Sequence, residues 1–145
     1  MMAEQNFANH TRVVPAFHFF VLPVLALNAV WSIVRVVKAG FSFDGIVWIL
    51  TAFAILLAAL FGRMFTLSVQ NRVIRLEERM RMERLLPADL KAHIGEFSCG
   101  QLIALRFASD AELPELARKV LTDKIQEGKA IKQMVKNWRA DYLRA

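Results

Sequence analysis

The sequence predicts an all-α protein: a two-helix transmembrane hairpin followed by a long amphipathic helix and a small cytoplasmic helical bundle. Apolar residues make up 56% of the 145 residues and charged residues 22%, and the two kinds are segregated along the chain. Residues 13–34 and 45–62 contain no Lys, Arg, Asp or Glu. After residue 63, apolar residues recur at helical spacing among charged ones, which is typical of amphipathic helices.

The charge pattern divides the chain into an anchor and a small appended unit. We expect six segments in order. They are an N-terminal segment (1–12), a first transmembrane helix (13–37), a loop (38–44), a second transmembrane helix (45–67), an amphipathic juxtamembrane helix (68–86) and a helical cytoplasmic domain (87–145). The single cysteine, Cys99, excludes an intramolecular disulfide framework and a thiolate cluster for zinc. We interpret it as a small core residue.

The first apolar segment, Phe17 to Val34, is long enough to cross a membrane. Its 18 residues span about 27 Å as a helix, close to the thickness of the hydrocarbon core. Pro23 removes one backbone hydrogen bond and is expected to kink the helix. A cleaved signal peptide is the alternative, but the apolar region is long, begins late and lacks a small-residue cleavage pattern.

The second apolar segment, Gly45 to Gly62, is equally long and more purely apolar. Trp48 lies near one end, where an interfacial aromatic residue is expected. The residues from 35 to 44 include Gly40 and predict a short reversal, so the two helices should be antiparallel neighbours.

The distribution of basic residues predicts that both termini face the cytoplasm. Residues 63–145 hold 16 Lys and Arg against 11 Asp and Glu, which is +5 of the net charge of +6. The loop between the spans has only Arg35 and Lys38, and the N-terminal flank adds only His10 and Arg12. Basic residues beyond the second span favour the cytoplasmic side and attraction to anionic lipid headgroups; they are Arg63, Arg72, Arg75, Arg79 and Arg81.

Polar residues inside the first span are candidates for helix packing in the membrane, namely His18, Asn28 and Ser32. Asn28 and Ser32 are four residues apart and share a face, which would suit packing on the second helix or on a second copy of the protein. A haem or metal role for His18 with His10 has little support, because no other ligand type lies nearby. We therefore expect no cofactor and no metal.

The segment from Met64 to Leu86 reads as one amphipathic helix. Four apolar residues at spacings of four, three and four line one face: Val69, Val73, Leu76 and Met80. The charges predicted on the opposite face are Arg72, Arg75, Glu78, Arg79 and Arg81. Such a helix would lie on the lipid surface or pair with another helix, although Glu83 interrupts the stripe and Pro87 ends the helix.

Three short helices around a small core are expected from Phe97 onward. The buried centre should be Gln101 to Phe107, which carries Leu102, Ile103, Leu105 and Phe107. Ser109 with Glu112 matches a capping box, and Pro114 suits a first helical turn. Gly128 predicts a break before a last helix whose buried face would be Ile131, Val135, Trp138 and Tyr142.

The tail's basic residues form a candidate interaction surface: Arg72, Arg75, Arg79, Lys129, Lys132, Lys136 and Arg139. The last two helices resemble a helix-turn-helix in outline, so a membrane-tethered nucleic-acid-binding module is the alternative function. The outline is common, and we favour lysines that solvate a bundle, with nucleic acid as an unlikely partner. No phosphate loop, metal-ligand cluster or catalytic set stands out, which predicts a protein that is not an enzyme.

The stretches QLIALRFASDAELPEL, KAIKQMVKNWRADYLRA and AEQNFANHTRVVPAFHF resemble an uncharacterised bacterial family of short two-span membrane proteins, a domain of unknown function. The resemblance covers nearly the whole chain. It implies a bacterial inner-membrane location but supplies no catalytic residues. We expect a structural or accessory assembly subunit, or a self-associating scaffold, whose partner is another protein or a further copy of the chain.

Overall fold

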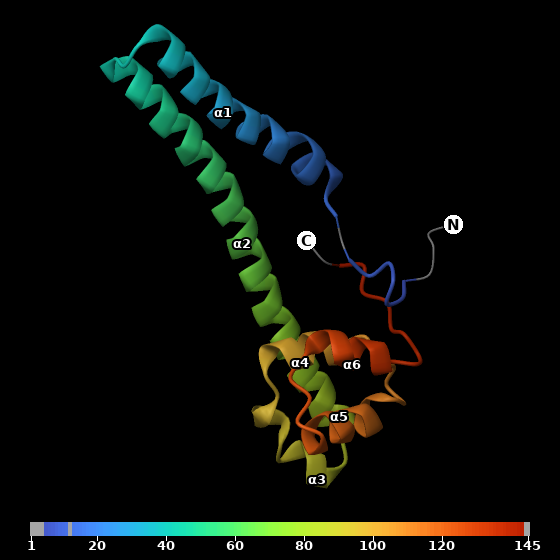
Figure 1. The fold of residues 1–145 in the computed structure, drawn as a ribbon. Coiled ribbons are helices and arrows are strands. Elements are labelled where there is room, and N and C mark those ends of the chain that lie inside the picture. The colour runs from blue at the N-terminus through green and yellow to red at the C-terminus, as the bar shows by residue number, and fades with distance from the viewer. Residues whose placement is uncertain (1–4, 12, 144–145) are drawn as a thin grey trace. The chain divides into compact units, whose positions relative to one another are not determined.

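The computed structural model of the protein describes residues 5–11 and 13–143. The remaining residues include Arg12 of the expected N-terminal flank and Arg144 at the end of the resemblance. Helices dominate the described residues, which contain no strand beyond an isolated bridge pair, so the all-α prediction is confirmed for them. The described residues divide into two compact units, residues 13–67 and residues 5–11 with 68–143, each described by itself below (Figure 1).

The first unit begins with a π-helical turn, η1 (Ala16–Val21), that runs directly into α1 (Leu22–Ala39). Pro23 lies at the start of α1 but inside the continuous helical segment Ala16–Ala39, so its missing N–H removes one backbone hydrogen bond. The change from π to α geometry next to a proline is the local irregularity expected of a Pro-containing helix.

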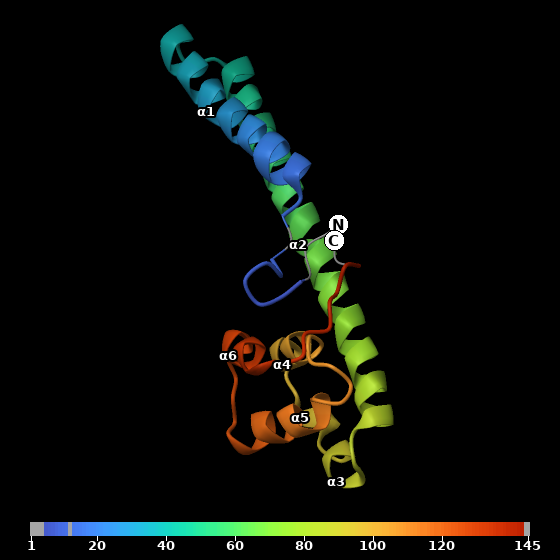
Figure 2. The same cartoon turned by 90° about the vertical axis from the view of Figure 1, so that its right-hand side faces the viewer.

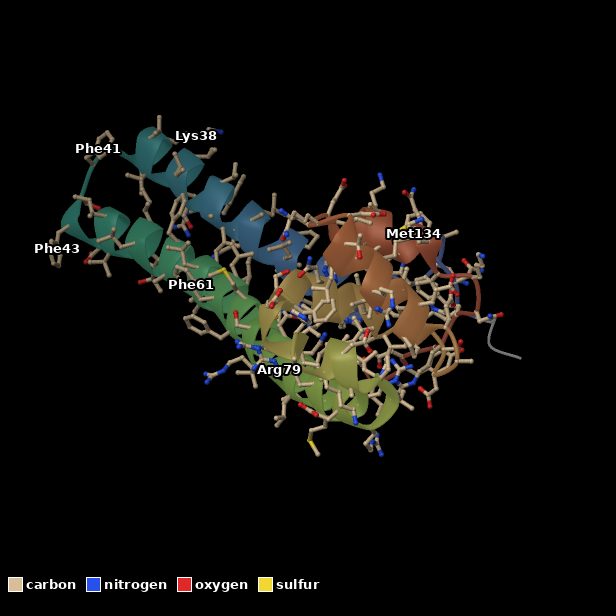
Figure 3. All side chains as sticks on the ribbon, turned by 90° about the horizontal axis from the view of Figure 1, so that it is seen from below. Lys38, Phe41, Phe43, Phe61, Arg79 and Met134 are labelled. Atoms are coloured by element: carbon tan, nitrogen blue, oxygen red, sulfur yellow. The ribbon has the colours of Figure 1, made fainter. Side chains whose placement is uncertain are left out.

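A short turn connects α1 to α2 (Phe43–Leu85), and Figures 1 and 2 show α1 beside the first part of α2. Gly40 adopts φ +87° in this turn, a conformation that favours glycine. A Cβ on Gly45 would lie 2.9 Å from Cγ2 of Val36, so glycine permits the close approach of the two helices. Figure 3 shows the labelled Phe41 and Phe43 at this end of the hairpin.

Both helices are long and apolar enough to cross a membrane, and their most apolar stretches bury only 17% and 6% of their residues. The core helix of a soluble protein is mostly buried, so these two helices are not of that kind. Their large apolar side chains lie on the surface of the unit, with exposed fractions of 68% at Leu27 and 63% at Leu50.

The second unit, here called the helical domain, packs short helices against the end of α2. These are α3 (Ala88–Lys91), the 3-10 turn η2 (Ile94–Glu96), α4 (Cys99–Leu105), α5 (Leu113–Thr122) and α6 (Gly128–Met134) (Figures 1 and 2). Pro87 ends α2 and starts α3, as the sequence predicted. The largest fully buried side chains are Phe107, Met82, Leu102, Leu105, Leu113, Ile131 and Val120.

The helix starts follow from local sequence. Ser98 and Gln101 form a capping box for α4, with the Gln101 N–H donating to Ser98 Oγ at 3.2 Å and the Ser98 N–H donating to Gln101 Oε1 at 2.7 Å. Pro114 lies in the first turn of α5, as predicted. The box predicted at Ser109 forms only in part, because the Glu112 N–H donates to Ser109 Oγ but the Glu112 carboxylate turns elsewhere.

The predicted last helix is wrong beyond Met134, where α6 ends. The residues that follow lie beside the segment after α4, with the Arg139 N–H donating to the Phe107 carbonyl at 2.7 Å and the Ser109 N–H to the Asn137 carbonyl at 3.0 Å. The Glu112 carboxylate also accepts the backbone N–H groups of Lys136 and Asn137. These bonds replace those of a helix, so helical spacing no longer describes the segment.

We predict that Leu102→Ala destabilises the helical domain by about 2–5 kcal/mol, because the side chain is fully buried and leaves a cavity. Leu143→Ala, at a side chain 99% exposed, is the matched control and should change stability by less than about 0.5 kcal/mol. Denaturant unfolding of the full chain in detergent measures both, followed by Trp138 fluorescence in a background with Trp31→Phe and Trp48→Phe. Equal effects of the two substitutions would contradict this core.

Candidate interaction surface

The face of α2 that packs into the helical domain differs from the one the sequence suggested. Ile74 and Met82 are buried there together with two charged residues, Glu78 and Arg81, each only 4% exposed. The prediction that Glu78 and Arg81 lie on an outward charged face is therefore wrong. Helical periodicity shows which residues share a face, but the partner decides which face is buried.

Arg81 joins α2 to the turn before α5. Its Nη1 donates to Glu78 Oε2 at 3.0 Å, its Nη2 to the Ala108 carbonyl at 2.7 Å, and its Nε to Asp110 Oδ1 at 2.8 Å. A planar guanidinium with donors in a fixed fork suits three such acceptors. The buried charge is thus paired and hydrogen-bonded, as stable burial requires.

Glu78 lies between two guanidinium groups. Its Oε2 accepts from Arg81, and its Oε1 accepts from Arg139 Nη1 at 3.4 Å. Burial raises the pKa of Glu78 above its usual value, and the neighbouring arginines act in the opposite direction. Because the pKa of Glu78 is raised, its protonated form favours the folded state at low pH. This contribution to stability is lost as the pH rises through the folded-state pKa.

The pKa values of Asp110 and Asp89 are lowered, in contrast to that of Glu78. The hydrogen bond from Arg81 lowers the pKa of Asp110 below 3.8, and the hydrogen bond from Arg118 lowers the pKa of Asp89. A lowered carboxyl pKa stabilises the fold above the unfolded-state value and loses that contribution as the pH falls through the folded-state pKa. The hydrogen bond from Arg81 to Asp110 therefore stabilises the domain at neutral pH, and this contribution is lost in acid.

A second cluster lies around the buried Phe107 ring, which stacks on Trp138 with ring centroids 4.4 Å apart. The Arg106 guanidinium lies 4.2 Å from the Phe107 centroid, and its Nε is 3.0 Å from Asp141 Oδ2. The His10 ring packs edge-on against Phe107 at 5.6 Å. Contacts with Phe107 and His10 hold the partly buried Trp138 in the helical domain.

The N-terminal segment belongs to the helical domain, which no local pattern predicted. Gln5 Oε1 accepts from the Asp141 backbone N–H at 2.8 Å, and Gln5 Nε2 donates to the Asp141 carbonyl at 3.2 Å. Lys132 Nζ lies 3.2 Å from His10 Nε2. More than a hundred residues separate these partners, so only the tertiary fold brings them together.

The apolar stripe predicted on α2 lies on the surface of the helical domain. Val69, Leu76 and Met80 are each 61% exposed and Val73 is 49% exposed. We call these four residues the α2 stripe. Beside it, Arg72 and Arg75 are exposed and Arg79 is partly buried.

The four basic residues near the C-terminus do not share one helix. Lys129 and Lys132 lie on α6, whereas Lys136 and Arg139 follow its end. Lys132 Nζ lies 5.7 Å from the Phe107 centroid, and Arg139 pairs with Glu78. The structure therefore does not assemble a basic recognition helix from them.

In the first unit, residues 13–67, the polar residues of the first helix differ in exposure. Ser32 is buried and its hydroxyl donates to the Asn28 carbonyl at 2.7 Å, whereas the Asn28 side chain is exposed. Both line a cavity of about 210 Å³ that α1 and the start of α2 share, with Trp31 and Trp48 in its walls. His18 lies at the other end of the helix, where its Nδ1 is 2.9 Å from the Val14 carbonyl.

The structure brings together no set of three His, Cys, Asp or Glu side chains suited to a metal ion within residues 5–11 and 13–143. The ionic groups that cluster do so as Arg–carboxylate pairs, which bind segments to one another. The exposed features of the helical domain are an apolar stripe and its flanking charges.

A family model described as "Family of unknown function (DUF6526)" matches residues 2–145. No curated protein and no solved structure matches the chain. The family match bears out the resemblance in its coarser part, a family of unknown function that covers the chain.

We predict that Arg81→Met destabilises the helical domain by about 3–5 kcal/mol, because it leaves Glu78 buried without its nearest cation. Arg75→Met, on an exposed side chain of the same helix, should cost less than about 0.5 kcal/mol. The unfolding assay with Trp138 as the probe compares them. A loss at Arg81 no larger than that at Arg75 would contradict the network.

We predict that Asp110→Asn lowers stability at neutral pH and reduces the loss of stability on acidification. The wild-type contribution is present above the unfolded-state pKa and disappears as the pH falls from about 5 to below 3.8. Asp89 and Glu78 titrate in both proteins, so the difference between their unfolding free energies isolates Asp110. Unfolding curves measured from pH 7 to pH 3 provide the comparison, and parallel pH profiles would refute this role.

Proposed function

The chain belongs to the DUF6526 family of unknown function, and we propose that it is a non-enzymatic inner-membrane assembly protein of bacteria. In this proposal the hairpin crosses the membrane and associates with a second copy or with a larger complex. The helical domain faces the cytoplasm. The exposed Asn28 amide within an apolar span is the observation that carries the proposal.

Support for the membrane location comes from the surface of the hairpin unit. Large apolar side chains remain exposed along both of its helices, and lipid is the solvent that matches them. Both helices satisfy their backbone polar groups internally, as a spanning segment must. That this membrane is the bacterial inner membrane is part of the proposal and rests on the resemblance described above.

The proposed topology rests on charge and aromatic residues. Phe41 in the turn between the helices and Phe43 at the start of α2 are exposed, and aromatic residues favour the membrane interface. Basic residues are concentrated after the second span, which favours the cytoplasm for both termini.

Self-association is supported by Asn28. Its amide has no hydrogen-bonding partner among the residues that the structure describes, and it lies 12 residues before Gly40 in an apolar helix. An amide in hydrocarbon gains about 0.6–2 kcal/mol from a partner on another helix. Ser32 is already satisfied within its own helix, so Asn28 is the group left to bind a neighbour.

The alternative, a membrane-tethered nucleic-acid-binding module, has less support. Recognition by a helix-turn-helix needs a helix that presents several side chains to a groove. Here α6 has seven residues, and Arg139 is engaged by Glu78.

The proposal is tested with a fluorescent reporter fused after Ala145. We expect cell fluorescence, since such a reporter folds in the cytoplasm, and a mass of at least two chains by light scattering in mild detergent. Asn28→Leu should reduce the assembled fraction, whereas Leu27→Ala, an apolar change at an exposed neighbour, should preserve it. A dark fusion would overturn the topology. A monomer without co-purifying protein would overturn the assembly.

A further inference from the structure

The α2 stripe has the spacing of a coiled-coil seam. Val69, Val73, Leu76 and Met80 follow one another at four, three and four residues, the pattern of alternating a and d positions. Each is about half exposed or more, while Ile74, on the opposite side of α2, is buried in the helical domain. The helix therefore uses one face for its own domain and leaves the coiled-coil face free.

The charges beside the stripe are complementary between two parallel copies. In this register Arg72 occupies a g position and Glu77 the e position five residues later, which face each other across a parallel two-stranded coiled coil. Neither side chain has an ion-pair partner within the described part of the chain. An antiparallel pair that aligned the same four residues would instead set Arg72 against Arg79 and Glu77 against Gln70, so no opposite charges would meet.

The same charges favour a protein partner over a lipid surface. Amphipathic helices that bind anionic membranes have a polar face rich in Lys and Arg. Here Glu77 borders one edge and Glu83 follows the stripe, and anionic headgroups would repel both.

We propose that the α2 stripe is the interface with a second copy of the chain, a short parallel coiled coil in which Arg72 of each copy pairs with Glu77 of the other. This deepens the proposed function and rests on it, because copies with one topology leave the membrane on the same side and need no reversal to pair. Four apolar residues are too few for a stable isolated coiled coil. Confinement to a membrane supplies the effective concentration that the short interface lacks.

Cysteine crosslinking in native membranes tests the interface. In a Cys99→Ala background, Val69→Cys and Met80→Cys are oxidised separately, and each should give a disulfide-linked dimer. Both positions are 61% exposed, so the substitutions spare the core. Arg75→Cys, on an exposed side chain outside the stripe, is the matched control and should remain monomeric. An antiparallel pair cannot join both Val69 and Met80 to their own counterparts.

A charge exchange tests the register. Arg72→Glu should raise the dissociation constant of the dimer roughly tenfold, because two attractive pairs become repulsive. The double variant Arg72→Glu with Glu77→Arg should restore the original value. Light scattering of the same samples separates the hypotheses. An assembled protein without crosslinks at the stripe, equal crosslinking at Arg75→Cys, or no rescue by the double variant overturns this interface alone, whereas a monomer overturns the proposed assembly as well.

Discussion

The packing of the helical domain depends on the hydrogen-bond acceptors of one guanidinium group, that of Arg81. Arg81 donates to Glu78, to the Ala108 carbonyl and to Asp110, and so fixes the turn before α5 against the end of α2. A buried cation without such acceptors would be too costly to keep. Because Arg81 points inward, the side of α2 that carries it becomes the packed side, and every other face of the helix is placed accordingly.

The burial of the side of α2 that carries Arg81 explains why the α2 stripe is exposed. Hydrophobic burial alone would turn Val69 and Leu76 toward the domain, since each buried apolar side chain contributes about 1.5–3 kcal/mol. The domain instead closes around Ile74 and Met82 with the Glu78–Arg81 pair between them. Burying an ion pair in place of available apolar residues leaves the stripe for a contact outside the monomer, as the coiled-coil proposal requires.

In the C-terminal residues too, hydrogen bonds to distant residues determine the conformation, and the helical spacing of the sequence does not. Backbone groups of Phe107 and Ser109 bond to Arg139 and Asn137, and the Glu112 carboxylate accepts two further N–H groups. Trp138 is thereby placed on Phe107, where His10 and the N-terminal segment complete the cluster. Residues 5–11 and the residues after Met134 thus pack within the helical domain.

The sequence by itself determined the local elements. Uninterrupted apolar runs specify two helices fit for a membrane, Pro87 and Pro114 set helix boundaries, and the apolar stretch around Leu102 specifies the buried centre. Of the candidate site, it identified the members of the α2 stripe, because residues on one helical face follow from periodicity. Only the tertiary structure decided that Arg81 is buried, that α6 stops at Met134 and that residues 5–11 pack on Trp138. These outcomes depend on partners distant in sequence, and helical period carries no information about which face, or which distant segment, a residue meets.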